Sequence, residues 1–154
     1  MTHPHIKTIE RRAREFRTAL ENCPRNLLPV GFEKFPTGSC ADASLLLGKY
    51  LRDNGLGEFE CVLADAGSHS DDDWHSHAWL RQGELIIDIT ADQFPDFDYP
   101  VFVATGSRWH KKYRIKDVHP ADYEIYDDYT RGALSVAYYR VVDFLEKSRP
   151  PGNE

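Results

Sequence analysis

The chain has 154 residues, 41% of them apolar, and a formal net charge of −6. That length supports one hydrophobic core and is too short for two ordinary domains, so we predict a single domain over residues 1–154. The negative charge does not favour binding to nucleic acid or to an anionic membrane, since both attract positive surface. No stretch approaches the roughly 20 apolar residues that span a bilayer.

The cysteine content indicates the cellular setting. The chain has three cysteines, an odd number, and it begins MTHPHIKTIERR, without the apolar run of a secretory signal. We therefore expect free thiols and a cytoplasmic location.

Helical periodicity occurs in three stretches of the chain. Apolar residues recur at three- and four-residue steps over residues 6–21, 40–54 and 129–145. Ser39 precedes the second stretch as its predicted N-cap, and Asp42 follows three residues later to complete a pattern similar to a capping box. The sequence thus predicts a helix that begins at Cys40, between an N-terminal and a C-terminal helix.

The middle of the chain has the composition of a β-sheet. Strand-like runs separated by Gly, Asp and Pro clusters occupy residues 58–63, 75–81, 84–90 and 101–104. We predict an α+β fold in which the helix at Cys40 packs on an antiparallel sheet and the terminal helices cover the remaining apolar surface.

Cys40 is the first candidate for chemistry. A thiol attacks as the thiolate, which is favoured at a helix N-terminus beside a histidine that can hold the proton. The alternative is that Cys40 is a small buried apolar residue, as most free cysteines are.

A predicted hairpin supplies the histidine. If Gln82 and Gly83 form a two-residue turn, His77 lies opposite Asp88 on the same face of the paired strands. The other face is entirely apolar and is expected to meet the core; its residues are Ala78, Leu80, Leu85, Ile87 and Ile89.

Cys40, His77 and Asp88 together form the nucleophile, base and orienting carboxylate of a thiol triad. The backbone N–H of Cys40, at the helix start, is the natural first donor of an oxyanion hole. Ser39, Trp79 and Gln93 are candidates for substrate binding, with core packing as the alternative for Trp79 and a turn role as the alternative for Gln93.

Three short motifs carry a family resemblance. Gly38-Ser39-Cys40, His77-Ala78-Trp79 and Asp88-Ile89-Thr90 resemble the transglutaminase-like branch of the papain-like cysteine enzymes over residues 35–94. The order of the three residues is also similar to that of the arylamine N-acetyltransferases. The resemblance implies a transglutaminase-like core over about residues 35–105.

The same resemblance implies a cysteine hydrolase or acyltransferase without a cofactor or a bound metal. A thioester would form at Cys40 from a peptide, a protein or a small amide or ester, and water or an amine would resolve it. The triad does not distinguish a peptidase or deamidase from a transferase, and the oligomeric state stays open.

Other readings compete with the triad. His75 and His77, with His69 or Asp88, could form a zinc-binding module, and an inactive domain of the same fold could bind a partner. The acidic run 71–73 could bind calcium or steer a cationic substrate, but a solvated loop is favoured.

Two further features are assigned to structure. Basic residues interleave with Trp109 and Tyr113 over residues 108–116, a composition found in RNA-contacting patches, but in an acidic chain we predict an exposed hairpin there. Cys23 and Cys61 are expected to be structural thiols.

Overall fold

The computed structural model describes residues 5–149, so the ends of the predicted domain, residues 1–4 and 150–154, lie outside the described residues. This part of the chain is an α+β arrangement of four α-helices and one antiparallel five-stranded sheet. The helices are α1 (Ile6–Asn22), α2 (Cys40–Asp53), α3 (Arg108–Lys111) and α4 (Asp128–Lys147). The strands are β1 (Glu60–Ala66), β2 (His75–Gln82), β3 (Leu85–Asp88), β4 (Phe102–Ala104) and β5 (Arg114–Pro120).

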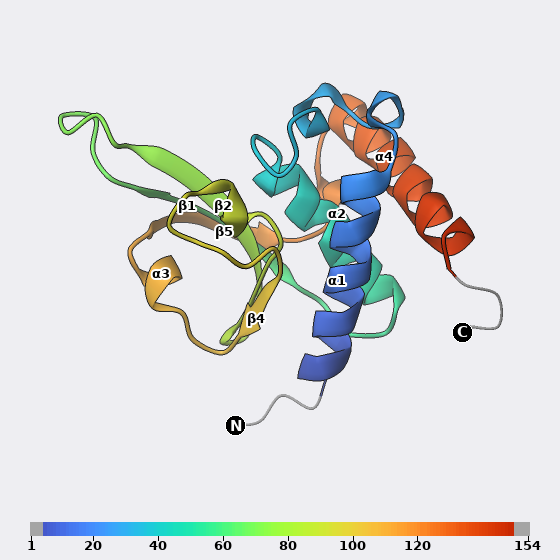
Figure 1. Cartoon of the computed structure of the whole chain (residues 1–154), viewed down its shortest axis with the longest axis horizontal. Helices are drawn as coiled ribbons and strands as arrows, with labels where there is room; N and C mark the ends of the chain where they lie inside the picture. The colour runs from blue at the N-terminus through green and yellow to red at the C-terminus, as the bar shows by residue number, and fades with distance from the viewer. Residues whose placement is uncertain (1–4, 150–154) are drawn as a thin grey trace.

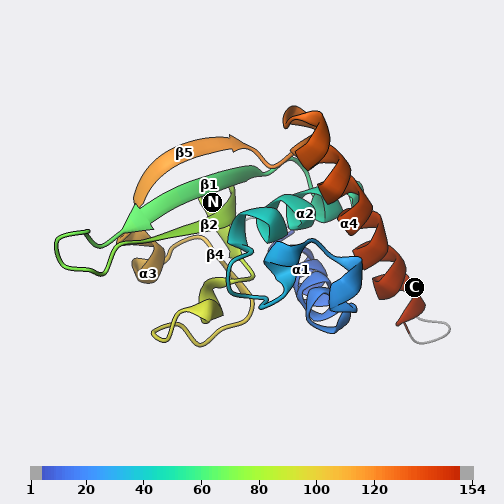
Figure 2. The same ribbon diagram turned by 90° about the horizontal axis from the view of Figure 1, so that it is seen from above.

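The three long helices gather on one side of the molecule, and α3 lies away from them (Figures 1 and 2). Helix α2 packs against β1 and β2, and α1 contacts α2, α4 and β4. The approach of α2 to the chain after β5 requires a glycine, because a Cβ atom at Gly48 would lie 2.7 Å from the Cβ of Ala121. Within residues 5–149, no helix is both long and apolar enough to cross a bilayer.

The strands follow the order β4-β3-β2-β1-β5. The four predicted strands are present, with shifted ends, and the segment predicted as an exposed hairpin instead forms α3 and the edge strand β5. That prediction was wrong because β5 is mostly exposed, and a strand without a regular apolar face has no alternating pattern by which the sequence would reveal it. β5 pairs with β1, with a register shift between Leu63 and Ala64.

The turn between β2 and β3 lies one residue later than predicted, which shifts the pairing of the two strands by two residues. Gln82 pairs with Leu85, so Gly83 and Glu84 form the turn rather than Gln82 and Gly83. The reason is steric: Gly83 has a φ of 58° while Glu84 has no positive φ, and a type II′ hairpin turn takes glycine at its first central position, so Gly83 begins the turn. Because strand faces alternate with period two, a shift of two residues preserves which side chains share a face.

The apolar face of the hairpin was predicted correctly. Its residues are at most 2% exposed; they are Ala78, Leu80, Leu85, Ile87 and Ile89. The other face carries a second buried cluster that includes Val62, Ala64, Trp79 and Tyr113. The sheet is therefore buried on both faces at this point, and the side chains of His77 and Asp88 lie away from water.

The N-terminus of α2 is where the sequence predicts it, but its capping is different. Ser39 occupies the N-cap position without making a side-chain capping bond. Its hydroxyl donates instead to the carbonyl oxygen of Pro36 at 3.4 Å, and Ser39 is 2% exposed. The predicted capping box between Ser39 and Asp42 is thus not formed, because the loop before α2 takes up the hydroxyl.

Candidate functional site

His77 and Asp88 meet inside the protein. Extending the observed β2–β3 register would set Thr90 opposite His77, so Asp88 is a diagonal neighbour rather than the predicted direct partner. The side chains nevertheless touch: His77 Nε2 lies 2.7 Å from Asp88 Oδ2, and both residues are 1% exposed. The predicted histidine–carboxylate contact is present, although the register used to derive it was wrong.

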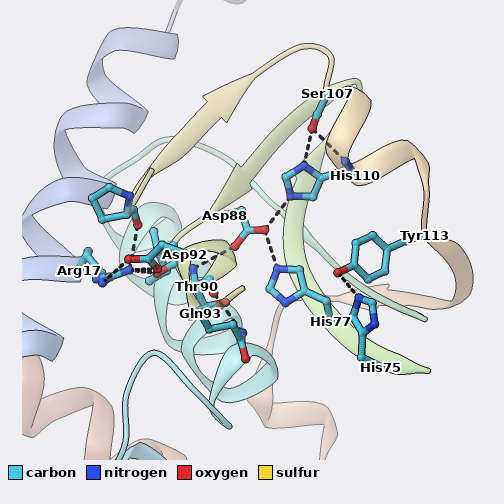
Figure 3. Close-up of polar contacts among 12 residues, drawn as sticks. Arg17, His75, His77, Asp88, Thr90, Asp92, Gln93, Ser107, His110 and Tyr113 are labelled. Atoms are coloured by element: carbon cyan, nitrogen blue, oxygen red, sulfur yellow. Dashed lines mark hydrogen bonds and ion pairs between the residues drawn. The ribbon is translucent and has the colours of Figure 1, made fainter. Parts of the chain in front are cut away.

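The Asp88 carboxylate has two further donors. The backbone N–H of Thr90 donates to Oδ1 at 3.0 Å, and His110 Nε2 lies 2.7 Å from Oδ2. Figure 3 shows Asp88 between the two imidazole rings. The carboxylate is therefore fixed from β2, from α3 and from the turn that follows β3.

The second ring nitrogen of His77, Nδ1, is not used by Asp88. This nitrogen is buried and makes no hydrogen bond to the described residues that meets the usual criteria. Cys40, the first residue of α2 and only partly buried, lies close enough to affect the pKa of His77 through its charge and its hydrogen-bonding capacity. The structure thus brings Cys40, His77 and Asp88 together, with Asp88 on one ring nitrogen and the other nitrogen available to the thiol.

Electrostatics favour the charged forms of the pair. Burial acts to lower the pKa of His77, but the charge and hydrogen bond of Asp88, and then Cys40, raise that pKa to about 9. Burial likewise opposes ionisation of Asp88, but His77 and His110 hold its pKa well below the ordinary value. An imidazolium at His77 facing an ionised Asp88 is the state that these contacts stabilise.

Aromatic side chains enclose His77. The rings of Phe94, Trp109 and Tyr113 lie 5.1 Å, 5.7 Å and 5.9 Å from the imidazole, centroid to centroid. Trp79 lies at 5.7 Å along the same strand face. These rings keep water away from the His77–Asp88 contact and strengthen it.

One group within the described residues has the composition of a metal site: His77, Asp88 and His110. Its geometry is that of hydrogen bonding, because both Nε2 atoms lie 2.7 Å from the same carboxylate oxygen. Ligands about 2.1 Å from a tetrahedral ion lie roughly 3.4 Å from one another. A metal ion would require these side chains to separate.

The zinc module suggested by the sequence is not assembled. His75 lies on the same strand as His77, but its ring is held elsewhere: Nδ1 contacts the Asp73 carbonyl at 2.9 Å, and Nε2 contacts the Tyr113 hydroxyl at 2.9 Å, as Figure 3 shows. His69 stacks on Trp74, 4.9 Å between ring centroids, in the loop between β1 and β2. The ring nitrogens of His75 are thus already in use.

The three predicted substrate-binding residues are placed differently from one another. Trp79 is 3% exposed and Ser39 is 2% exposed, so both are packed in the interior. Gln93 is half-buried, and its side-chain amide donates to the Thr90 carbonyl at 3.0 Å, which is the turn role. Gln93 thus supports the turn after β3, Trp79 packs on the sheet face that carries His77, and Ser39 precedes Cys40.

The remaining candidates are structural. Cys23 and Cys61 are buried, as predicted, and burial raises the pKa of Cys61 to about 12. The basic segment is partly neutralised: Lys112 pairs with Asp96 at 3.0 Å and Arg114 with Asp65 at 2.8 Å. Its aromatic residues pack toward His77 rather than outward, which removes the stacking surface that an RNA-binding patch needs.

The sequence interpretation missed His110 as a site residue. The local signal was Ser107 three residues before it, since Ser107 caps α3 by accepting from the His110 N–H. That spacing could have predicted the short helix. It could not have predicted the contact with Asp88, which depends on how α3 folds back onto the sheet.

No protein-family model, curated protein or solved structure matches this chain in the comparisons.

Proposed function

We propose that this protein is a cysteine-dependent acyl-transfer enzyme with Cys40 as nucleophile, His77 as base and Asp88 as the orienting carboxylate. One observation carries the proposal: His77 is held by Asp88 through Nε2 at 2.7 Å, while its Nδ1 has no completed hydrogen bond within residues 5–149 and Cys40 is near enough to raise its pKa. A buried polar atom without a partner is costly, so its retention is consistent with a functional use.

The topology supports a transglutaminase-like core for this proposal. A helix that starts at the cysteine precedes adjacent antiparallel strands that carry the histidine and then the aspartate. This is the order that the motifs around Cys40, His77 and Asp88 share with the transglutaminase-like enzymes.

In the proposed reaction, Cys40 Sγ gives its proton to His77 Nδ1 and the sulfur attacks a carbonyl carbon. The C–S bond forms, the C–N or C–O bond of the substrate breaks, and the leaving group takes the proton from His77. Water or an amine then attacks the thioester and gives a proton to Nδ1, and the C–S bond breaks to restore the Cys40 thiol. No cofactor is needed for this balance.

The N-terminus of α2 favours the anionic states of this reaction. The N–H of Cys40, as the first residue of the helix, is not used within the helix. It can donate to the carbonyl oxygen as negative charge develops there. The N-terminal end of the helix dipole also favours a negatively charged sulfur.

Site-resolved alkylation tests the proposal. We expect iodoacetamide to modify Cys40 at neutral pH much faster than Cys23 or Cys61, which are buried in the same chain and serve as internal controls. The His77→Gln variant should react at Cys40 about tenfold more slowly or worse, because the proton acceptor is lost. Equally slow modification of all three cysteines would contradict the proposal and favour an inactive partner-binding domain.

A trapped intermediate separates acyl transfer from simple thiol reactivity. With p-nitrophenyl acetate, mass spectrometry of the quenched protein should find one acetyl group on Cys40, and the Cys40→Ser variant should show none. Neutral hydroxylamine should remove the acetyl group, because it cleaves a thioester. Stoichiometric zinc in the purified protein that is lost in the His77→Gln variant would instead favour a metal site.

A further inference from the structure

His110 occupies a position that the proposed triad does not account for. It is 4% exposed, and its Nε2 lies 2.7 Å from the same Asp88 oxygen that His77 contacts. The two imidazoles come from different elements, β2 and α3, which are far apart in the sequence. A buried carboxylate that serves only to orient His77 does not require a second imidazole.

Asp88 and Ser107 together fix which nitrogen of His110 carries the hydrogen. The Ser107 hydroxyl oxygen accepts from the His110 backbone N–H at 3.1 Å and lies 2.6 Å from His110 Nδ1. An ionised carboxylate only accepts, so the hydrogen between His110 and Asp88 belongs to His110 Nε2, and Nδ1 is left to accept the Ser107 hydroxyl hydrogen. His110 therefore presents an N–H at Nε2 and donates to Asp88, as Figure 3 shows for the line of Ser107, His110 and Asp88.

We propose that His110 is a positioning residue of the Cys40 site: through its hydrogen bond to Asp88 it holds the carboxylate so that the His77 ring presents Nδ1 to Cys40. This inference rests on the proposed function. Thr90 N–H fixes one carboxylate oxygen at 3.0 Å and His110 fixes the other at 2.7 Å. His77 Nε2–H is then left with a single acceptor direction, and its ring with a single orientation.

His110 also limits how strongly Asp88 acts on His77. A second donor at the same oxygen shares the negative charge, so it weakens the attraction between that oxygen and an imidazolium at His77. The other titratable groups that face His77 are Cys40 at the start of α2 and Tyr113 after α3. Loss of the His110 hydrogen bond should thus move the deprotonation of His77 to higher pH as well as loosen the ring.

A serine nucleophile is the competing use of the same residues. Ser107, His110 and Asp88 have the connectivity of a serine triad, but the Ser107 oxygen also accepts the backbone N–H of His110, the bond that caps α3. Capping α3 accounts for Ser107 without catalysis. Labelling of Ser107 by a fluorophosphonate probe would overturn the positioning role.

The test compares the full chain with three variants. His110→Leu removes the donor, His110→Gln keeps an amide donor at a similar reach, and Ser107→Ala releases Nδ1 while keeping the ring. The measurements are the rate of Cys40 alkylation against pH and the NMR titration of His77. We expect about a tenfold slower alkylation and an upward-shifted His77 titration for His110→Leu, near-normal values for His110→Gln, and a smaller change for Ser107→Ala.

The outcomes separate this inference from the proposed function. If folded His110→Leu keeps the wild-type alkylation profile and His77 titration while His77→Gln slows Cys40, the positioning role is wrong and the triad stands. If Cys40 of the unmodified protein reacts no faster than Cys61, the proposed function fails first. If His110→Leu does not fold, the comparison of His110→Gln with His110→Asn replaces it, because the shorter amide of asparagine does not reach Asp88. Equal alkylation and titration profiles for these two variants would overturn the inference.

Discussion

Two buried polar networks involve the end of β3 and the residues directly after it, 88–92, and they differ in the chemistry that their side chains allow. In one, Arg17 of α1 donates to the Ile89 carbonyl at 2.7 Å and to both oxygens of Asp92, at 2.7 Å and 2.9 Å. In the other, Asp88 accepts from His77 and His110 at 2.7 Å each. Figure 3 shows both networks on either side of Asp88 and Thr90.

Each network has one buried side-chain nitrogen without a hydrogen-bond partner among the described residues, and the two nitrogens differ in what they can do chemically. In the first network it is Arg17 Nε, which can only donate, so leaving it without a partner is only a cost. In the second it is His77 Nδ1, which can accept or release a proton next to a thiol. The first network stabilises the segment, and the second has the capacity for chemistry.

Breaking the Arg17 network should have the largest effect on stability. Arg17→Met leaves Asp92 without its cation and removes the clamp on the Ile89 carbonyl, so we expect a loss of about 3 kcal/mol in the free energy of unfolding. Urea denaturation measures this loss. The Cys40 alkylation rate of the folded variant should stay within about twofold of wild type, since the two networks do not share a side chain.

Arg14→Met is the matched control on the same helix. Arg14 is exposed and lies 3.7 Å from Glu10, so its loss should cost less than about 0.5 kcal/mol. Equal losses for the two variants would show that the buried clamp contributes no more than a surface ion pair. A large drop in Cys40 alkylation in Arg17→Met would show that the two networks are coupled.

Periodicity accounts for what could be predicted of the fold. The stripe over residues 6–21 gave α1, and the wholly apolar face that includes Leu80 and Ile87 placed the hairpin against the core. β5 carries no such face because it is an edge strand, and the turn at Gly83 was misplaced because its φ was not considered. Errors fell where backbone geometry rather than burial decides the structure.

The candidate site was likewise predictable only in part. His77 and Asp88 could be paired because strand parity survives a register shift of two residues, and Cys40 could be added because it begins a helix. His110 and Arg17 could not be found, because each reaches its carboxylate across the fold: Arg17 and Asp92 lie 75 positions apart, and His110 and Asp88 lie 22 apart. A pattern within one element carries no information about such pairs.

The pH dependence of stability sharpens the contrast between the networks. The pKa of His77 is raised from its ordinary 6.5 to about 9, so the folded protein binds the extra proton between these values. Its stabilising contribution is complete below about pH 6.5 and is lost as pH rises through about 9. We expect a decrease of about 3 kcal/mol in the free energy of unfolding across that window, measured by urea denaturation.

His77→Gln is the control for this decrease, because it removes the titrating ring and should flatten stability over the same window. Subtracting its profile also removes other alkaline effects, such as that of buried Cys61, whose pKa is raised to about 12. Arg17→Met should retain the full pH dependence, since it leaves the contact between His77 and Asp88 in place. A wild-type profile as flat as that of His77→Gln would argue against a charged His77–Asp88 pair.

The smallest expected effect concerns Thr90, which lies between the two networks. Its backbone N–H donates to Asp88, while its buried hydroxyl has no partner among residues 5–149. Thr90→Val keeps the shape and the backbone bond, so stability should change by less than about 1 kcal/mol, toward stabilisation. Thr90→Ser, the control, keeps the hydroxyl and loses a methyl, at a cost of about 1 kcal/mol. Slower Cys40 alkylation in Thr90→Val alone would give the hydroxyl a part in the site.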